Sequence, residues 1–175
     1  MGKVLVLIDI QNIYFTEGPY KLYKPEECTD NILKVLEYFR KNDLPIIHVK
    51  HNFKVPGEKK EYLNSIYESV SPKKNEEIVE KNYPNSFLKT NLKDILDKYK
   101  VDELIVAGMM SHMCIDTSVR AAMDYGYKVK LVGDGCTTMD LKYKDEIIKA
   151  ETVTKAIIAS LDGMFAEIVS YKDFK

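Results

Sequence analysis

Short apolar runs alternate with amphipathic segments along almost the whole chain. Runs rich in branched residues predict strands that are buried on both faces, at residues 4–8, 45–49, 76–80, 103–107, 127–132 and 166–169. Apolar positions three or four residues apart predict helices at residues 26–41, 91–100, 115–125 and 144–161. This alternation predicts an α/β fold with three α/β/α layers, a Rossmann-like domain with a mostly parallel sheet of about six strands.

Local signals set the expected ends of these elements. Thr29 or Asp30 suits the N-cap of the first helix, and Gly126 suits the end of the third. Residues 134–137 read as a turn. Residues 52–75 are polar and contain Pro-Gly, which predicts a long surface excursion with one short helix at residues 61–69. Loops of this length in compact domains are often functional.

Composition narrows the class of protein. A chain of 175 residues, 45% of them apolar and 30% charged, fits one soluble domain over residues 1–175. A net charge of −1 gives no support for nucleic acid or a membrane surface as a partner. The N-terminal apolar run is too short for a signal peptide, and three cysteines are too few for a disulfide framework. We therefore expect a cytoplasmic protein.

Three reactive residues follow predicted strands. Asp9 comes directly after residues 4–8, Lys81 after residues 76–80, and Cys114 six residues after a glycine that ends an apolar run. Ligands of such folds bind beyond the carboxyl ends of the strands. Each residue alone has a simpler explanation, as a turn former, a solvated cation or a buried thiol. Together they offer a base, an orienting group and a nucleophile, which is the usual set for covalent catalysis.

Four stretches resemble the isochorismatase-like cysteine hydrolases, the group that includes nicotinamidases and pyrazinamidases. They are residues 6–12 (VLIDIQN), 80–87 (EKNYPNSF), 108–114 (GMMSHMC) and 121–129 (AAMDYGYKV), the last followed by Asp134-Gly135-Cys136. The resemblance covers nearly the whole chain, and the ordered set is more specific than any one stretch.

The resemblance implies a triad in which Asp9 is the general base, Lys81 the orienting cation and Cys114 the nucleophile. It also implies a cis peptide bond between Met109 and Met110, and an oxyanion hole formed by the N–H groups of Met110 and Cys114. The implied reaction is hydrolysis of a small carboxamide through a thioester on Cys114, with release of ammonia. The implied partners are a small-molecule substrate and further copies of the chain in a homo-oligomer.

Nicotinamidases usually bind a divalent metal through an Asp-x-His pattern after the second strand. Here His51 and Phe53 stand at those positions. We therefore expect no metal and no cofactor, and nicotinamide is not favoured as the substrate. Tyr14, His51 and Phe87 are candidates for contact with substrate, although core packing is the default expectation for the two aromatic residues and a partly exposed loop position is equally open for His51. Gln11 and Asn12 are expected to brace the loop.

Two other functions stay open. One is an isochorismatase-type cleavage of a vinyl ether, with Asp9 as the acid and no need for the thiol. The other is a non-catalytic, thiol-responsive domain that binds small ligands. A nucleotide-binding Rossmann domain is disfavoured, because no G-x-G-x-x-G follows the first strand.

Overall fold

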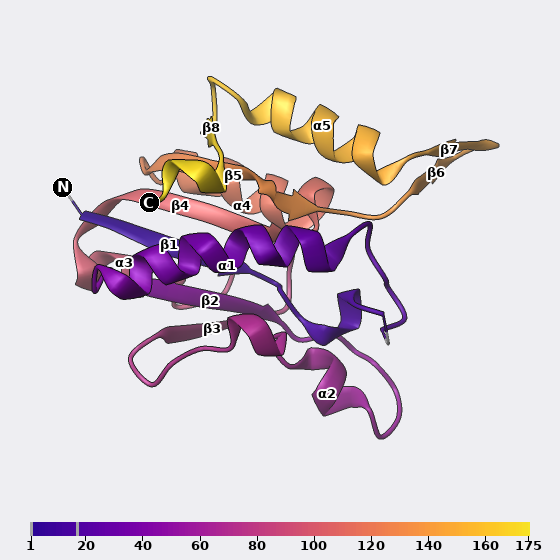
Figure 1. Cartoon of the computed structure of the whole chain (residues 1–175), viewed down its shortest axis with the longest axis horizontal. Coiled ribbons are helices and arrows are strands. Elements are labelled where there is room, and N and C mark those ends of the chain that lie inside the picture. The colour runs from indigo at the N-terminus through magenta and orange to yellow at the C-terminus, as the bar shows by residue number, and fades with distance from the viewer. Residues whose placement is uncertain (1, 17) are drawn as a thin grey trace.

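The centre of the molecule is one parallel sheet of six strands. The computed structural model describes residues 2–16 and 18–175. All five strand pairs of this sheet are parallel, in the order β3-β2-β1-β4-β5-β8 (Figure 1). The strands are β1 (Gly2–Ile8), β2 (Ile46–His51), β3 (Glu77–Lys81), β4 (Val101–Met109), β5 (Lys128–Thr137) and β8 (Glu167–Val169). The predicted three-layer fold is confirmed.

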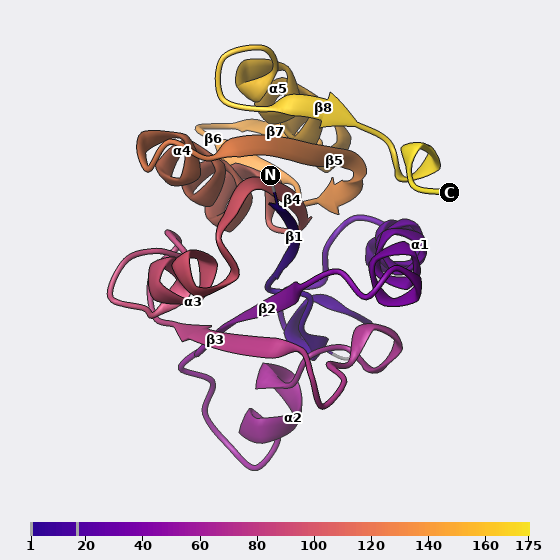
Figure 2. The same ribbon diagram turned by 90° about the vertical axis from the view of Figure 1, so that its left-hand side faces the viewer.

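Helices cover both faces of the sheet. Helix α1 (Pro25–Lys41) lies on one face, and α3 (Leu92–Tyr99), α4 (Asp116–Asp124) and α5 (Ala150–Leu161) lie on the other (Figure 2). Strand β1 divides its side chains accordingly. Leu5 and Leu7 belong to the apolar cluster that contains α1, whereas the alternate side chains of β1 belong to the cluster of α3 and α4. A strand buried on both faces explains the continuous apolar run in the sequence.

The first helix begins earlier than the sequence indicates. Pro25 is its first residue, and Lys24 before it adopts a left-handed conformation with φ 45°. Proline suits this position because its missing N–H would lack a partner there in any case. Thr29 is not a cap. It lies inside the helix, where its hydroxyl donates to the Pro25 carbonyl at 2.7 Å.

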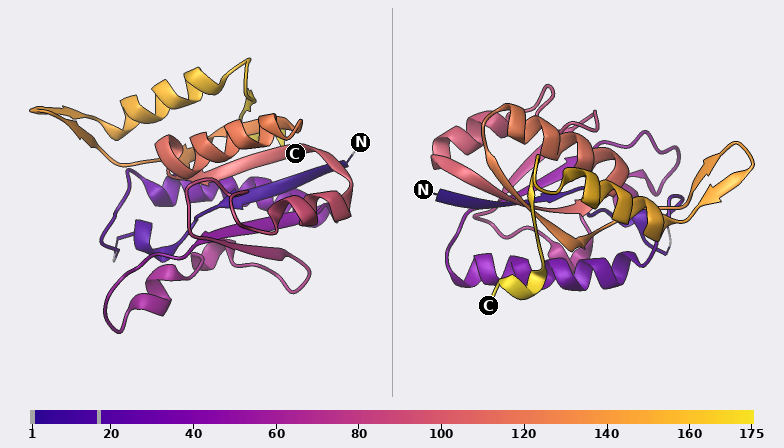
Figure 3. Two further views of the ribbon diagram at one scale, coloured as in Figure 1. Left: turned by 180° about the vertical axis from the view of Figure 1, so that it is seen from behind. Right: turned by 90° about the horizontal axis from the view of Figure 1, so that it is seen from above.

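The predicted helix over residues 144–161 is wrong in its first part. Strands β6 (Leu141–Tyr143) and β7 (Glu146–Ile148) form an antiparallel hairpin that extends away from the body of the molecule (Figure 3). Lys144 at the turn has φ 52°, which a helix does not allow. The Asp140 carboxylate accepts the Ala150 N–H at 2.8 Å, so the helix starts only at Ala150.

The excursion over residues 52–75 is packed against the body. It holds helix α2 (Lys60–Asn64) and the short 3-10 helix η2 (Glu68–Val70) in place of the single predicted helix.

Residues 134–137 are also not a turn, because β5 continues through them after a shift of register against β4. Two further 3-10 turns are η1 (Asn12–Tyr14) and η4 (Tyr171–Asp173). No helix within residues 2–16 and 18–175 combines the length and the apolar character needed to cross a membrane.

Candidate active site

Adjacent parallel strands end at the same edge of the sheet and place the candidate residues there. Asp9 follows the last residue of β1, and its N–H donates to the Val49 carbonyl of β2 at 2.9 Å. His51 and Lys81 are the last residues of β2 and β3 and are paired in register. Asp9 adopts a left-handed backbone with φ 54°, uncommon for a residue other than glycine. Such a conformation is often found at functional sites.

Cys114 reaches the same edge through the end of β4. Gly108 lies beside Ile8 and has φ 138°; a Cβ atom there would lie 2.0 Å from the Ile8 carbonyl oxygen, so only glycine fits. The Met109–Met110 peptide bond that follows is cis. One π-helical turn, η3 (Ser111–Ile115), then carries the thiol and leads directly into α4.

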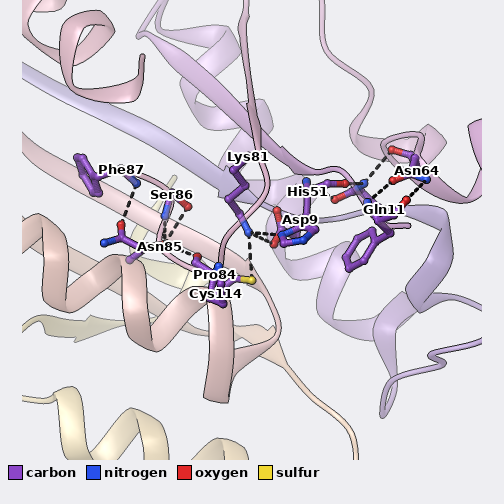
Figure 4. A network of polar contacts seen from close by, with 12 residues as sticks. Asp9, Gln11, His51, Asn64, Lys81, Pro84, Asn85, Ser86, Phe87 and Cys114 are labelled. Carbon is purple, nitrogen blue, oxygen red and sulfur yellow. Dashed lines mark hydrogen bonds and ion pairs between the residues drawn. The ribbon is translucent and has the colours of Figure 1, made fainter. Parts of the chain in front are cut away.

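The amino group of Lys81 lies at the centre of the cluster (Figure 4). Its Nζ atom is 2.6 Å from Asp9 Oδ2, 3.1 Å from His51 Nδ1 and 3.1 Å from Cys114 Sγ. An ammonium group donates hydrogen bonds and has no acceptor, so the ring nitrogen and the sulfur accept from it, while the contact with Asp9 is an ion pair. It follows that His51 Nδ1 is the acceptor and carries no proton. The side chains of Asp9 and Lys81 are fully buried, and Cys114 is 4% exposed.

Burial controls the protonation of this cluster. It raises the pKa of the Asp9 carboxyl above its usual value, while the Lys81 ammonium acts in the opposite direction. Burial, followed by the charge of Asp9, raises the pKa of the Cys114 thiol to about 12. The thiol is therefore protonated at neutral pH in the resting site. A carboxylate oxygen of Asp9 lies within 4.8 Å of this sulfur.

His51 and Tyr14 both lie near the triad. Burial and then the charge of Lys81 lower the pKa of His51 to about 4, so its ring stays neutral at physiological pH. The ring packs against Phe53 with the centroids 4.5 Å apart and the planes tilted by 32°, and Tyr14 meets Phe53 edge-on at 5.6 Å. Burial, followed by the charge of Asp9, raises the pKa of the Tyr14 hydroxyl.

The structure does not bring Phe87 to the triad. Its ring packs against Tyr125 at 5.0 Å and Tyr127 at 6.3 Å, near the end of α4 remote from Cys114. Figure 4 shows the side chain turned away from the Lys81 amino group. The sequence suggested it because it lies close to Lys81 in the chain, but the chain turns after Pro84 and directs this side chain into the core. Phe87 is therefore a packing residue in this structure.

Two side-chain amides brace the site, that of the buried Gln11 and that of the half-buried Asn64. Gln11 accepts the His51 N–H at 2.8 Å, and its Nε2 donates to the carbonyls of His51 at 2.9 Å and Asn64 at 2.8 Å. Asn64 in turn holds the backbone of Phe53 through both its amide atoms. The bracing role of Gln11 was expected from the sequence. That of Asn64 was not, because nothing marks one asparagine in a polar loop.

A nicotinamidase-type metal site does not fit these residues. Phe53 stands where that pattern has a ligand, and it covers one face of the His51 ring. Within residues 2–16 and 18–175, one group of three or more possible ligands lies close together: Asp9, His51 and Cys114. The Lys81 ammonium already occupies the position between their donor atoms.

A cavity of about 750 Å³ is lined by Phe53, the residue that packs against His51. Its walls are mostly apolar, with two lysines and the acidic Glu58. They include Tyr20, Phe53, Val55, Leu63, Lys54 and Lys59. All but Tyr20 come from the excursion between β2 and β3, so that segment shapes the space next to His51.

Comparisons with known proteins agree with this geometry. The Isochorismatase domain model matches residues 3–170. The chain is 40% identical over 180 residues to the uncharacterized isochorismatase family protein YddQ of Bacillus subtilis, covering 99% of each. It is 33% identical to the secreted isochorismatase effector Isc1 of Verticillium dahliae, covering 98% of this chain and 89% of the relative. The crystal structure of an isochorismatase from Pseudomonas putida matches with a TM-score of 0.94 at 35% identity, covering 99% and 90%. The chain therefore belongs to the isochorismatase family of hydrolases.

Proposed function

We propose that the protein is a cysteine hydrolase that cleaves the C–N bond of a small carboxamide and releases ammonia. The observation that carries this proposal is the position of the Lys81 amino group, 2.6 Å from the Asp9 carboxylate and 3.1 Å from the Cys114 sulfur. It holds an acid and a thiol together in a buried site. A domain that only binds ligands has no need for this buried charge pair, which is costly to desolvate.

The proposed reaction begins with proton transfer from the Cys114 thiol to the Asp9 carboxylate. The raised pKa of Asp9 makes it a stronger base than an exposed aspartate. The sulfur attacks the amide carbon, and the N–H groups of Met110 and Cys114 receive the oxyanion, each contributing about 3 kcal/mol in comparable sites. Asp9 passes its proton to the departing ammonia. Water, deprotonated by Asp9, then cleaves the thioester and restores the thiol.

A small substrate with an apolar body suits the surroundings. The cavity of about 750 Å³ that Phe53 lines is a space that could hold it. Two distant relatives are named for action on amides: Nicotinamidase 3 of Arabidopsis thaliana, 29% identical over 154 residues, and maleamate amidohydrolase of Pseudomonas putida, 27% identical over 103 residues. They support amide chemistry without identifying the substrate.

Vinyl-ether cleavage is the second candidate. The relatives named as isochorismatases favour it, and an aspartate with a raised pKa can also serve as an acid. That reaction needs Asp9 but not the Cys114 thiol.

We also propose that the protein acts as a homo-oligomer in a reducing compartment. The exposed hairpin supports the homo-oligomer. The three free thiols support the reducing compartment.

An ammonia-release screen over a panel of small carboxamides tests the proposal, with isochorismate assayed in parallel for pyruvate release. We expect ammonia from at least one amide, with the rate lost in Cys114→Ala and retained in Cys136→Ala. Pyruvate release that survives Cys114→Ala, with no amide hydrolysed, would establish the vinyl-ether reaction in its place. Absence of both activities would favour the binding domain.

A further inference from the structure

The His51 ring has two nitrogen atoms, of which the protein engages one. Nδ1 accepts a hydrogen bond from Lys81 Nζ at 3.1 Å (Figure 4), so the single proton of the neutral ring is on Nε2. Within residues 2–16 and 18–175, the buried side-chain atoms that lack a hydrogen-bond partner belong to Asp9 and Asp102. His51 Nε2 has no partner in that part of the chain either, but it is not one of these buried atoms. The half-buried ring therefore presents an open N–H donor.

This N–H group lies close to the reacting sulfur. One nitrogen of the His51 ring, one oxygen of Asp9 and the sulfur of Cys114 all lie within 4.8 Å of one another. A carbonyl carbon that is positioned for attack lies about 3–3.5 Å from its nucleophile. The body of a small amide at Cys114 therefore lies within reach of the ring. The Nδ1 lone pair and the Nε2–H bond of an imidazole diverge, so the N–H group points away from Lys81 and is free for such a ligand.

Contacts with the protein fix the ring in place. Phe53 packs against it with the centroids 4.5 Å apart. Gln11 accepts the His51 N–H at 2.8 Å and donates to the His51 carbonyl at 2.9 Å, which holds the backbone. Burial and then the charge of Lys81 lower the pKa of the ring to about 4, so the donor is uncharged at neutral pH. A donor that is fixed before the ligand arrives loses little conformational entropy on binding.

We propose that His51 binds the substrate through its Nε2–H group, which donates a hydrogen bond to an acceptor atom in the body of the molecule. This inference rests on the proposed amide hydrolysis and adds a substrate class to it: small carboxamides that carry an ether oxygen, a second carbonyl oxygen or an unprotonated ring nitrogen. A methylene group at that place leaves the N–H group without a partner. A protonated amine brings its own N–H groups against this donor and lies near the Lys81 ammonium, so both contacts are repulsive.

Ring amides that differ at one ring atom test this selection. Cyclohexanecarboxamide has a methylene group where the tetrahydropyran carboxamides have an ether oxygen and the piperidine carboxamides have a protonated amine. The quantity compared is kcat/KM for ammonia release at neutral pH. We expect the best ether isomer to exceed cyclohexanecarboxamide by about ten-fold or more, and the matching ammonium isomer to fall below it.

Two substitutions of His51 separate the hydrogen bond from the rest of the ring. In His51→Asn the side-chain oxygen can replace Nδ1 as the acceptor for Lys81, but no donor reaches the place of Nε2, so the ether preference should vanish. In His51→Gln the longer side chain brings an amide N–H near that place, so part of the preference should return. A loss of rate that is equal for the ether and methylene compounds in both variants would overturn the proposal, because it would show that His51 only supports the fold.

Two further measurements separate this inference from amide hydrolysis. Calorimetric binding of the same compounds to Cys114→Ala should also favour the ether isomer, and such a preference without any turnover would retain the role of His51 and refute the amidase. Ether and methylene compounds that behave alike in both turnover and binding, including the absence of both, would overturn the role of His51. Nitrogen NMR of the wild-type protein should show the ring proton of His51 on Nε2, and a proton on Nδ1 would overturn that role as well.

Discussion

At the scale of single residues, the protonation states of Cys114, His51 and Asp9 determine how the site can react. The Cys114 thiol and the His51 ring are both held neutral by burial, with pKa values of about 12 and about 4. The buried charges are those of Asp9 and Lys81, which pair at 2.6 Å. Loss of one partner from a buried pair costs about 3–5 kcal/mol. The site thus keeps the Cys114 thiol protonated, next to a carboxyl group whose pKa burial raises.

The charge state of His51 can be measured directly. Its folded-state pKa of about 4 lies below the usual value of 6.5, so the unfolded chain binds a proton first as the pH falls. The contribution of His51 to stability is therefore complete above pH 6.5 and is lost progressively towards pH 4. We expect an NMR titration of its ring to show no midpoint above pH 5, with His51→Gln used for assignment. A midpoint near 6.5 would contradict both the burial of the ring and its contact with Lys81.

Whole elements were largely predictable from the sequence, and the exceptions have physical causes. The buried strands carry unbroken apolar runs, so their ends, and with them Asp9, Lys81 and Cys114, could be located. The hairpin at Leu141–Ile148 was missed because its apolar residues also fit a helical spacing. The contact of His51 with Lys81 depends on the register between β2 and β3, which the sequence does not encode locally.

The excursion between β2 and β3 depends on Gln11 for its position. Gln11→Leu would leave the backbone of His51 and the Asn64 carbonyl without buried partners. We expect a loss of about 2–4 kcal/mol in the free energy of unfolding and faster amide hydrogen exchange at residues 62–67. Asn42→Leu removes an exposed amide and serves as the control, with a change below about 0.5 kcal/mol. Equal stability and exchange in Gln11→Leu and wild type would show that the excursion is held by other contacts.

At the scale of the whole molecule, the β6–β7 hairpin stands apart from the three packed layers (Figure 3). A single two-stranded hairpin is marginally stable in water, and its open edges invite pairing with another chain. Tyr143 is 62% and Ile147 54% exposed on it. The hairpin leads directly into α5, and the Thr154 hydroxyl on that helix contacts Ser111 in η3 at 3.0 Å. Contacts made by the hairpin would therefore reach the turn that holds Cys114.

We expect the wild-type protein to be a homo-oligomer by light scattering, with the hairpin in the interface. The double variant Tyr143→Lys and Ile147→Lys should shift it to monomer because it places charges on the contact surface. Met164→Lys, at another exposed apolar residue, should leave the mass unchanged. A wild-type protein that is monomeric at tens of micromolar would refute the prediction of an oligomer.

The chain contains its own controls for the claim that Asp9 activates Cys114. Cys28, Cys114 and Cys136 are 6%, 4% and 7% exposed, and burial raises the pKa of all three thiols. Static exposure and acidity therefore do not favour Cys114. What sets it apart is the carboxylate of Asp9 within 4.8 Å of its sulfur.

The difference in reactivity between Cys114 and the other two thiols is measured most directly by alkylation with iodoacetamide, a small carboxamide, at pH 7.5. Peptide mass spectrometry follows the rate at each cysteine. Activation by a base predicts that Cys114 reacts about ten-fold or more faster than the other two thiols, and that Asp9→Asn removes this advantage. Equal rates at the three cysteines, or an unchanged rate at Cys114 in Asp9→Asn, would contradict the account.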